Sequence, residues 1–477
     1  MFTTRFTALI ASGVLLGSLV VGPSLPAGAA PVPSWHNPVS LPGVPANSSM
    51  ADQAACSAAG NCVVISNWPT TTPVRVYAST ELRGKWGQAQ IIGAGLKGFV
   101  VTAISCPNIR NCVVTGSYET STAINGVIIS ESNGRWGRPL PIITPPDVDG
   151  FTSSPGQMVY CWSAGNCVAG GGSGLAWVTV ETQGAWGSVV PFGSATNPFQ
   201  PGVAEDISCT GPGQCTVAGI DMAGGGVFVV TLSNGQWSSP VQLAEPASTI
   251  GTANGGQGAV NSISCASLGN CVLGGNYPII HGSMYHEIPY LATEVNGVWG
   301  PATAVARAEA ANTSGVGTTS YVRCWSGGVC VALGFYSRPG PMLTWESVLR
   351  GGHWTTALNL SASRAGVPFG ALGTEACTSP ADCVGTGWDM LPGASTTDYT
   401  IDNGHFGANP GLAVEVSEWN GKWQYGRWLY PYFSWVQAMT NAVTCSPTGT
   451  YCLMVGARVT GASYNPLARQ DIVSVYS

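Results

Sequence analysis

Acidic residues gather in one stretch of the chain, residues 365–421. It holds seven of the 23 Asp and Glu residues and no Lys or Arg. Two carboxylates can act on a glycosidic bond as general acid and as base or nucleophile, and a histidine titrates near neutral pH. The acids are Glu375, Asp382, Asp389, Asp398, Asp402, Glu415 and Glu418. The catalytic candidates are Asp389, Asp398, Asp402 and His405.

Aromatic residues accompany these acids. Rings combine a large apolar surface with a polar edge, so an aromatic platform beside carboxylates suits sugar binding. The expected ligand-binding residues are Trp388, Tyr399, Trp428, Tyr430, Tyr432 and Trp435. The same pattern is consistent with a structural role, in which the rings pack one repeat on the next and the acids are solvated.

A second candidate site is the segment His281-Gly-Ser-Met-Tyr-His286-Glu287. Histidines beside a carboxylate on a loop can bind a divalent metal or supply a general base. The spacing is not the H-E-x-x-H pattern of zinc enzymes, so loop histidines without a ligand are the alternative. His286 and Glu287 join the catalytic candidates. No cofactor is evident, and a divalent metal is left open.

All 16 cysteines fall into eight close pairs, seven with five intervening residues and one with six. An even number at a repeated spacing indicates disulfides formed in an oxidising compartment. The expected bridges are Cys56/Cys62, Cys106/Cys112, Cys161/Cys167, Cys209/Cys215, Cys265/Cys271, Cys324/Cys330, Cys377/Cys383 and Cys445/Cys452. We therefore expect no free thiol.

The cysteine pairs mark eight repeats of about 50 residues. In each, a β-branched run ends in a cysteine, as in VVTAISC at Cys106, and a later run meets a turn and a tryptophan, as in VIISESNGRW at Trp136. Four short strands per repeat with Asn-Gly turns are typical of a propeller blade, whereas solenoid repeats are about 20 to 30 residues long. We expect an all-β, eight-bladed β-propeller over residues 31–477, with four strands and one disulfide per blade.

The two ends of the chain predict how the ring closes. Seven repeats contain a tryptophan strand, but the eighth ends at Ser477 after its third run, DIVSVYS. Residues 35–41, WHNPVSL, resemble the tryptophan strands of other repeats, such as WSSPVQL. We expect this N-terminal strand to complete the last blade.

The turn before each tryptophan, as in Ser132-Asn133-Gly134-Arg135-Trp136, resembles a degenerate Asp-box, the S-x-D-x-G-x-T-W turn of sialidase-like propellers. Asp is absent from its place in every copy, so the hydrogen bonds of an Asp-box do not carry over. The chain is also similar to secreted bacterial propellers with S-C-x5-C repeats. Both resemblances imply fold and export, and neither implies an activity.

The N-terminus predicts export. Arg5 precedes an apolar run over residues 8–21, and Ala27-Gly28-Ala29 matches a small-residue cleavage site. The run is shorter than the about 20 apolar residues that span a bilayer. We expect a signal peptide over residues 1–30 and a secreted, extracellular protein without a membrane span.

Charge limits the partners. Charged residues make up 8% of the 477 residues, with 17 basic against 23 acidic. This composition excludes a disordered protein and predicts no cationic surface for nucleic acid or an anionic membrane. We expect a monomer that binds an extracellular polysaccharide or protein.

Two functions of different class fit these features. The preferred hypothesis is a recognition scaffold that binds a glycan or protein through the long, individual loops between second and third strands. The alternative is a carbohydrate-active enzyme, a glycoside hydrolase or polysaccharide lyase, that uses carboxylates and a histidine of the seventh and fifth repeats. A propeller fold hosts both classes and does not decide between them.

Overall fold

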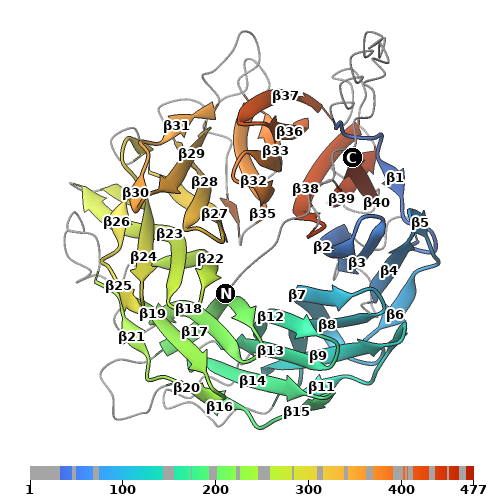
Figure 1. Cartoon of the computed structure of the whole chain (residues 1–477). Coiled ribbons are helices and arrows are strands. Elements are labelled where there is room, and N and C mark those ends of the chain that lie inside the picture. The colour runs from blue at the N-terminus through green and yellow to red at the C-terminus, as the bar shows by residue number, and fades with distance from the viewer. Residues whose placement is uncertain are drawn as a thin grey trace, which may run out of the picture. The chain divides into compact units, whose positions relative to one another are not determined.

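Each cysteine pair lies in the first hairpin of an antiparallel sheet, and eight such sheets make up the propeller (Figure 1). The computed structural model describes residues 33–45, 50–67, 75–142, 155–172, 174–192, 201–221, 226–244, 258–281, 284–308, 315–337, 342–360, 369–389, 401–402, 405–406, 412–428, 436–447, 449, 451–460 and 469–477. Residues 34–477 form one compact unit. The expected signal peptide lies outside the described residues.

The first four blades follow one another along the chain. Blade one comprises β2 (Met50–Ala58), β3 (Asn61–Asn67), β4 (Val76–Leu82), β5 (Lys85–Trp86) and β6 (Gln90–Ile92). Blade two comprises β7 (Lys97–Asn108), β8 (Asn111–Glu119), β9 (Ile124–Ser132), β10 (Arg135–Trp136) and β11 (Leu140–Pro141). Blade three comprises β12 (Gly156–Ser163), β13 (Asn166–Gly171), β14 (Trp177–Thr182), β15 (Ala185–Trp186) and β16 (Val190–Pro191). Blade four comprises β17 (Pro201–Gly211), β18 (Gln214–Asp221), β19 (Val227–Ser233), β20 (Gln236–Trp237) and β21 (Val241–Gln242).

The remaining blades differ more from one another. Blade five comprises β22 (Ala259–Ser267), β23 (Asn270–His281), β24 (Met284–Val295), β25 (Val298–Trp299) and β26 (Thr303–Ala304). Blade six comprises β27 (Gly317–Trp325), β28 (Val329–Ser337), β29 (Met342–Arg350), β30 (His353–Trp354) and β31 (Leu358–Asn359). Blade seven comprises β32 (Phe369–Ser379), β33 (Asp382–Asp389), β36 (Leu412–Trp419) and β37 (Lys422–Trp428), with the hairpin β34 (Ile401–Asp402) and β35 (His405–Phe406) inserted. Blade eight comprises β38 (Val436–Cys445), β39 (Cys452–Thr460), β40 (Arg469–Tyr476) and β1 (Val39–Ser40).

The fourth strand is interrupted in blades one to six, where two short segments both pair with the third strand. In blade one the first segment pairs Trp86 with Glu81, and the second pairs Ile92 with Val76. Between them the amide of Gly87 donates to the carbonyl of Thr80 at 2.9 Å. The predicted four-stranded blade is therefore confirmed, with a short break after the tryptophan.

Blade eight repeats this arrangement with the two ends of the unit. Trp35 forms a β-bridge with Tyr476, and Val39 pairs with Val473. The amide of His36 donates to the carbonyl of Val475 at 2.6 Å, the same bond that Gly87 makes in blade one. The Trp35 and Tyr476 ring centroids are 5.3 Å apart. The predicted closure by an N-terminal strand is confirmed.

The apolar core lies between blades. The innermost strands β2, β7, β12, β17, β22, β27, β32 and β38 contact one another in this order, and β38 contacts β2, which closes the ring (Figure 1). Among the described residues, eight hydrophobic clusters each join two neighbouring blades. Every sheet is thus buried on both faces, which explains why so few residues are charged.

The eight predicted disulfides are all present, and no cysteine is free. Each joins the first and second strands of its blade, and in blade one Cys56 is directly opposite Cys62 in the strand register. The bridges are Cys56–Cys62, Cys106–Cys112, Cys161–Cys167, Cys209–Cys215, Cys265–Cys271, Cys324–Cys330, Cys377–Cys383 and Cys445–Cys452.

The two faces of the propeller differ in their connections. One face holds the turns between first and second strands together with those between third and fourth strands, and we call it the tight-turn face. In blade one the two turns are bonded to each other, because the amide of Gly84 in the second turn donates to the carbonyl of Gly60 in the first at 2.9 Å. The loops between second and third strands lie at the opposite ends of the strands. We call this side of the propeller the loop face.

Candidate functional site

The structure brings two of the four blade-seven candidates together. Asp402 lies at the end of β34 and is directly opposite His405 of β35 in the strand register. Asp389 ends β33, where it is the register partner of Leu412. Asp398 lies outside the described residues. The inserted hairpin therefore places Asp402 and His405 at paired positions of adjacent strands.

The expected aromatic platform is described only in part. Trp388 of β33 is the register partner of Ala413, and Trp428, which ends β37, is the partner of Val414. Residues 413 and 414 are consecutive in β36, so positions 388 and 428 belong to opposite faces of the sheet. Tyr399, Tyr430, Tyr432 and Trp435 lie outside the described residues.

Three of the seven acids in this stretch are buried, which for these three corrects the expectation of exposed or solvated carboxylates. Glu375, Glu415 and Glu418 are 5%, 0% and 4% exposed. Ser320 donates its hydroxyl to Glu375 at 3.1 Å, and burial raises the pKa of Glu375 to about 7. Asp382 accepts the amide of Asn420 at 2.9 Å. These four acids lie in β32, β33 and β36, the strands of the blade itself.

The blade-five candidates lie on strands, so their expected place on a loop is wrong. β23 and β24 continue as a hairpin up to the pair His281 and Met284. His286 is 7% exposed, and the amide of Glu287 donates to the carbonyl of Gly315 at 2.7 Å. Burial raises the pKa of Glu287. Consecutive strand residues point to opposite faces, so His286 and Glu287 do not form one cluster.

The cysteines, conspicuous in the sequence, belong to the core and not to a functional site. The second cysteine of every pair is almost fully buried, at 0–3% exposed. These residues are Cys62, Cys112, Cys167, Cys215, Cys271, Cys330, Cys383 and Cys452. A side chain that is this deeply buried does not meet a ligand, so the bridges have the structural role that the sequence predicted for them.

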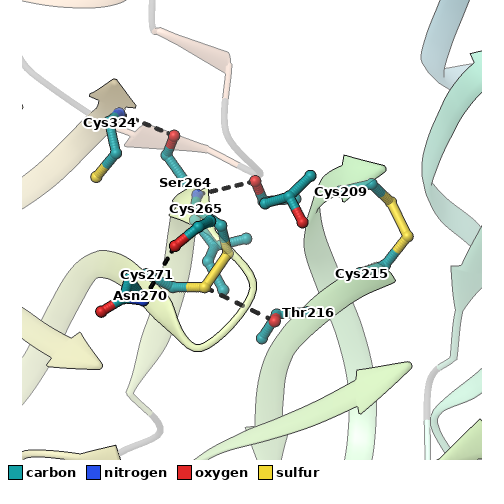
Figure 2. The surroundings of a disulfide bond; sticks show 12 residues. Cys209, Cys215, Thr216, Ser264, Cys265, Asn270, Cys271 and Cys324 are labelled. Carbon is teal, nitrogen blue, oxygen red and sulfur yellow. Dashed lines mark hydrogen bonds between the residues drawn. A yellow bond between two sulfur atoms is a disulfide. The ribbon is translucent and has the colours of Figure 1, made fainter. Parts of the chain in front are cut away.

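Each buried cysteine faces a junction between blades. Cys112 packs in the hydrophobic cluster between blades one and two, Cys330 in that between blades five and six, and Cys383 in that between blades six and seven. The Sγ of Cys271 lies 3.7 Å from the hydroxyl oxygen of Thr216 in blade four (Figure 2). The disulfides therefore stabilise the hairpins and also fill the space between sheets.

No metal centre is present in the described part of the chain, where no three His, Cys, Asp or Glu side chains are placed to hold an ion. The same residues contain no helix with the length and apolar character to cross a membrane.

A repeated row of buried glutamates escaped the sequence analysis, which singled out only Glu418 among its members. In blade three Glu181 of β14 is directly opposite Cys167 on one side and Trp186 on the other. A blade with this glutamate therefore has three residues in a row across its sheet: the second cysteine, the glutamate of the third strand and the tryptophan of the fourth. The row glutamates, 2–5% exposed, are Glu81, Glu131, Glu181, Glu294 and Glu418. Their signal is the recurring E-x-x-G-x-W, as in ELRGKW and EWNGKW.

Burial shifts these carboxyl groups toward the protonated form. It raises the pKa of Glu131 to about 7 and that of Glu294 to about 6. The pKa of Glu418 rises to about 8, through burial first and then through Glu346 and Asp382. Glu346 of blade six accepts the indole N–H of Trp423 from blade seven at 3.1 Å. The row glutamates lie at blade junctions rather than in an accessible site.

Adjacent carboxylates also lie on the innermost strand of blade four, at Glu205 and Asp206. Burial raises their pKa values to about 7 and about 6. Glu205 accepts the amide of Val260 at 2.8 Å, and Asp206 accepts the amide of Ile263 at 2.8 Å. Both acceptors therefore bind the backbone of blade five. This pair has the composition of a catalytic dyad, but its hydrogen bonds join two blades.

Glu205 belongs to a repeated feature of the inner wall. The innermost strand of every blade has a β-bulge four residues before its first cysteine. The bulged residues are Asp52, Thr102, Gln157, Glu205, Asn261, Ser320, Gly373 and Asn441. Thr102 donates to the carbonyl of Gly156 at 2.6 Å and Asn441 to that of Ala51 at 2.8 Å. A bulge re-aims a side chain, and in blades two, four, five, six and eight it aims a polar group at the next blade.

These features define the class of protein: an eight-bladed β-propeller in which disulfides stabilise the hairpins and bulged residues join neighbouring blades. No family model and no curated protein matches the chain.

Among solved structures, the chain is similar to YCF48 from Cyanidioschyzon merolae, with 12% identity over 73% of this chain and 95% of that one and a TM-score of 0.41. It is similar to a polysaccharide lyase, ulvan lyase, bound to -[GlcA(1-4)Rha3S]-, with 11% identity over 75% and 89% of the two chains and a TM-score of 0.40. It is also similar to a subtype N10 neuraminidase-like protein of A/little yellow-shouldered bat/Guatemala, with 11% identity over 69% of this chain and 99% of that one and a TM-score of 0.32. At these identities no functional residue carries over to this chain.

Proposed function

We propose that the protein is a secreted recognition protein that binds an extracellular glycan or protein on its loop face. The observation that carries the proposal is the contrast between the two faces. The loop face bears the long hairpin of blade five and the inserted hairpin of blade seven. The tight-turn face repeats one short turn from blade to blade. Function concentrates on individual loops that a rigid scaffold positions.

The rigidity of the scaffold supports this assignment. In blade one the side-chain carbonyl of Asn61 accepts the amide of Arg83 at 3.2 Å, which ties the two tight turns together. Asn111, Asn166, Asn270 and Asp382 make the same bond in their blades. A scaffold with fixed turns and bridged hairpins loses little entropy when it binds a ligand.

The eight disulfides indicate a non-cytoplasmic protein, because such bonds persist in oxidising compartments. Together with the apolar segment within residues 1–30, they support export by a cleaved signal peptide. Mass spectrometry of the secreted protein tests this directly, with an N-terminus near residue 31 as the expected result.

A carbohydrate-active enzyme is the second candidate, and one observation favours it. Asp402 and His405 are register partners on the inserted hairpin, an element that the described residues of the other blades do not contain. Asp389 at the end of β33 and Asp398 complete the candidate set for a glycoside hydrolase or a polysaccharide lyase.

A panel of polysaccharides, scored for both retention and newly released chain ends, separates the two candidates. The recognition proposal expects retention on a polymer without products, and retention that falls when Trp428 is changed to Ala. Product formation that is lost in Asp402→Asn and His405→Gln would contradict the recognition proposal and support the carbohydrate-active enzyme. Running the panel with and without EDTA reports whether a divalent metal takes part. A panel with neither retention nor products would contradict a glycan ligand and leave the protein ligand to test by cross-linking.

A further inference from the structure

The basic residues of this acidic chain are unevenly distributed. On the tight-turn face, blade one presents Arg83 and Lys85, and blade two presents Arg110 and Arg135, all four exposed. The turns of blades three, four and five carry no charged side chain. A net charge of −6 predicts no cationic surface, yet local potential depends on where charges lie. We call these four residues the basic turn patch.

The patch belongs to two neighbouring blades. Arg83 directly follows β4, and Arg110 lies two residues after the end of β7; these two strands contact each other. The aliphatic part of the Arg110 side chain lies over the turn at Gly134, 3.4 Å from the place a Cβ would occupy there. Arg110 therefore lies beside the turn that carries Arg135.

The acidic residues that flank the patch in sequence are buried. The acids nearest in sequence, Glu81 and Glu131, are 2% and 3% exposed, and burial raises the pKa of both. Arg110 lowers the pKa of Glu131 by a smaller amount, so its charge reaches this buried group. The exposed pair Lys97 and Glu119, 3.6 Å apart, lies at the loop-face ends of β7 and β8.

The turns hold the patch in place before any ligand binds. The amide of Gly134 donates to the carbonyl of Arg110 at 2.9 Å, as Gly84 does to Gly60, and Asn111 accepts the amide of Asn133 at 3.3 Å. Arg83 and Arg110 have φ of 50° and 69°, which is a left-handed backbone conformation. At the position that corresponds to Arg110, most other blades have a glycine. Arginine is thus present where the backbone favours a smaller residue.

We propose that the basic turn patch binds an acidic polysaccharide, one whose uronate carboxylates pair with the guanidinium groups. Arginine recognises carboxylates through two parallel hydrogen bonds. Around the cations the turns present polar, uncharged side chains, Asn108, Asn111, Ser132 and Asn133, which suit sugar hydroxyls. The four turns expose no large hydrophobic residue that would enter a membrane. The tryptophans that follow them, Trp86 and Trp136, are half-buried, so no exposed ring is available to stack on nucleic-acid bases. The inference is independent of the proposed function, which lies on the opposite face.

The repeats themselves supply substitutions that fit the turns. Gln183 and Gly165 are the blade-three counterparts of Arg83 and Arg110, and Gln236 of blade four is the counterpart of Arg135. We therefore combine Arg83→Gln with Arg110→Gly in one variant, and Lys85→Gln with Arg135→Gln in another. The matched control is Lys422→Gln, which removes a cation from the same turn position in blade seven.

The measurement is binding of the full chain to immobilised polygalacturonate at rising salt, with neutral dextran, duplex DNA and anionic phosphatidylglycerol vesicles as parallel probes. We expect binding to polygalacturonate that weakens with salt and that falls at least about tenfold in either double variant, with Lys422→Gln within about twofold. An unchanged melting temperature shows that the variants are folded. Absence of binding, equal loss in the control, or equal binding to DNA or to vesicles would overturn the proposal.

Discussion

The hydroxyl of Ser264 accepts the backbone N–H of Cys324 at 2.9 Å, across the junction between blades five and six (Figure 2). Ser208 makes the same bond to Cys265 at the junction before it, at 3.0 Å. In these blades the serine before the first cysteine thus accepts the backbone N–H of the first cysteine in the next blade. In blade six Arg323 replaces this serine, and the hydroxyl of Tyr321 accepts the amide of Cys377 at 3.0 Å.

Replacing this serine tests the junction. Ser264 is 5% exposed, so Ser264→Ala leaves the amide of Cys324 buried without its acceptor. We expect the free energy of unfolding to fall by about 1–3 kcal/mol, measured by equilibrium unfolding in urea with the disulfides intact. Ser132→Ala, at an exposed turn, should change it by less than about 0.5 kcal/mol. Equal effects of the two changes would show that the bond adds nothing.

Ring closure depends on Trp35, which is 9% exposed and packs on Tyr476. Trp35→Ala should cost about 3–5 kcal/mol, the range for a large aromatic residue removed from a core. Val39 on the same strand is 49% exposed, so Val39→Ala is the matched control and should be nearly neutral. Thermal unfolding of both variants, and of a chain without residues 31–42, measures the effect. A truncated chain that melts like the complete one would contradict the closure.

The disulfides predict both a thiol count and a stability. Alkylation under denaturing conditions should find no free cysteine among the 16. Changing Cys209 and Cys215 together to Ser should lower stability by about 2 kcal/mol, the chain-entropy value for a loop this short. Because the bridge lies within one hairpin, we expect the variant to keep the fold. Several free thiols in the unaltered protein would refute the pairing.

The buried glutamates predict that stability falls as pH rises. In the folded chain the pKa is about 7 for Glu131 and about 8 for Glu418, against an ordinary value of 4.5. Between about pH 5 and 8 the folded protein binds protons that the unfolded chain has released, so each pH unit weakens folding. The loss should level off above about pH 8, where both states are ionised. Urea midpoints measured from pH 5 to 9 give the profile.

A neutral isostere identifies the responsible group. Glu418 faces two further carboxyl groups, those of Glu346 and Asp382, and Arg350 lies near Glu346. Glu418→Gln removes the need for a proton and should flatten part of the pH profile. Glu119→Gln, which changes a half-exposed acid, should leave the profile as it is. A midpoint that rises from pH 5 to 8 would show that these groups are ionised in the fold.

Local signals in the sequence predict most of the fold. The Cys209/Cys215 spacing marks one hairpin, and Asn234-Gly235 before Trp237 marks another, because turns and bridges depend on residues close along the chain. The closing strand was also predictable, since WHNPVSL at Trp35 completes a count of eight tryptophan strands.

The candidate site was less predictable. Asp402 and His405 are three residues apart, and only the hairpin pairing makes them direct neighbours. His286 and Glu287 read as loop residues because the sequence does not show how far β23 and β24 stay paired. The row glutamates were visible as E-x-x-G-x-W, but nothing in that motif states that Glu181 lies between a cysteine and a tryptophan.

The number of blades, the eight bridges and the closing strand follow from short patterns that recur along the chain. Which polar residues meet water depends instead on how the blades pack against one another. Glu415 and Glu418 belong to the same acidic stretch as Asp402, yet they lie inside a blade junction. Burial depends on the neighbouring sheet, whose residues are distant in sequence, so a count of charges along the chain cannot separate a buried carboxyl group from a surface one.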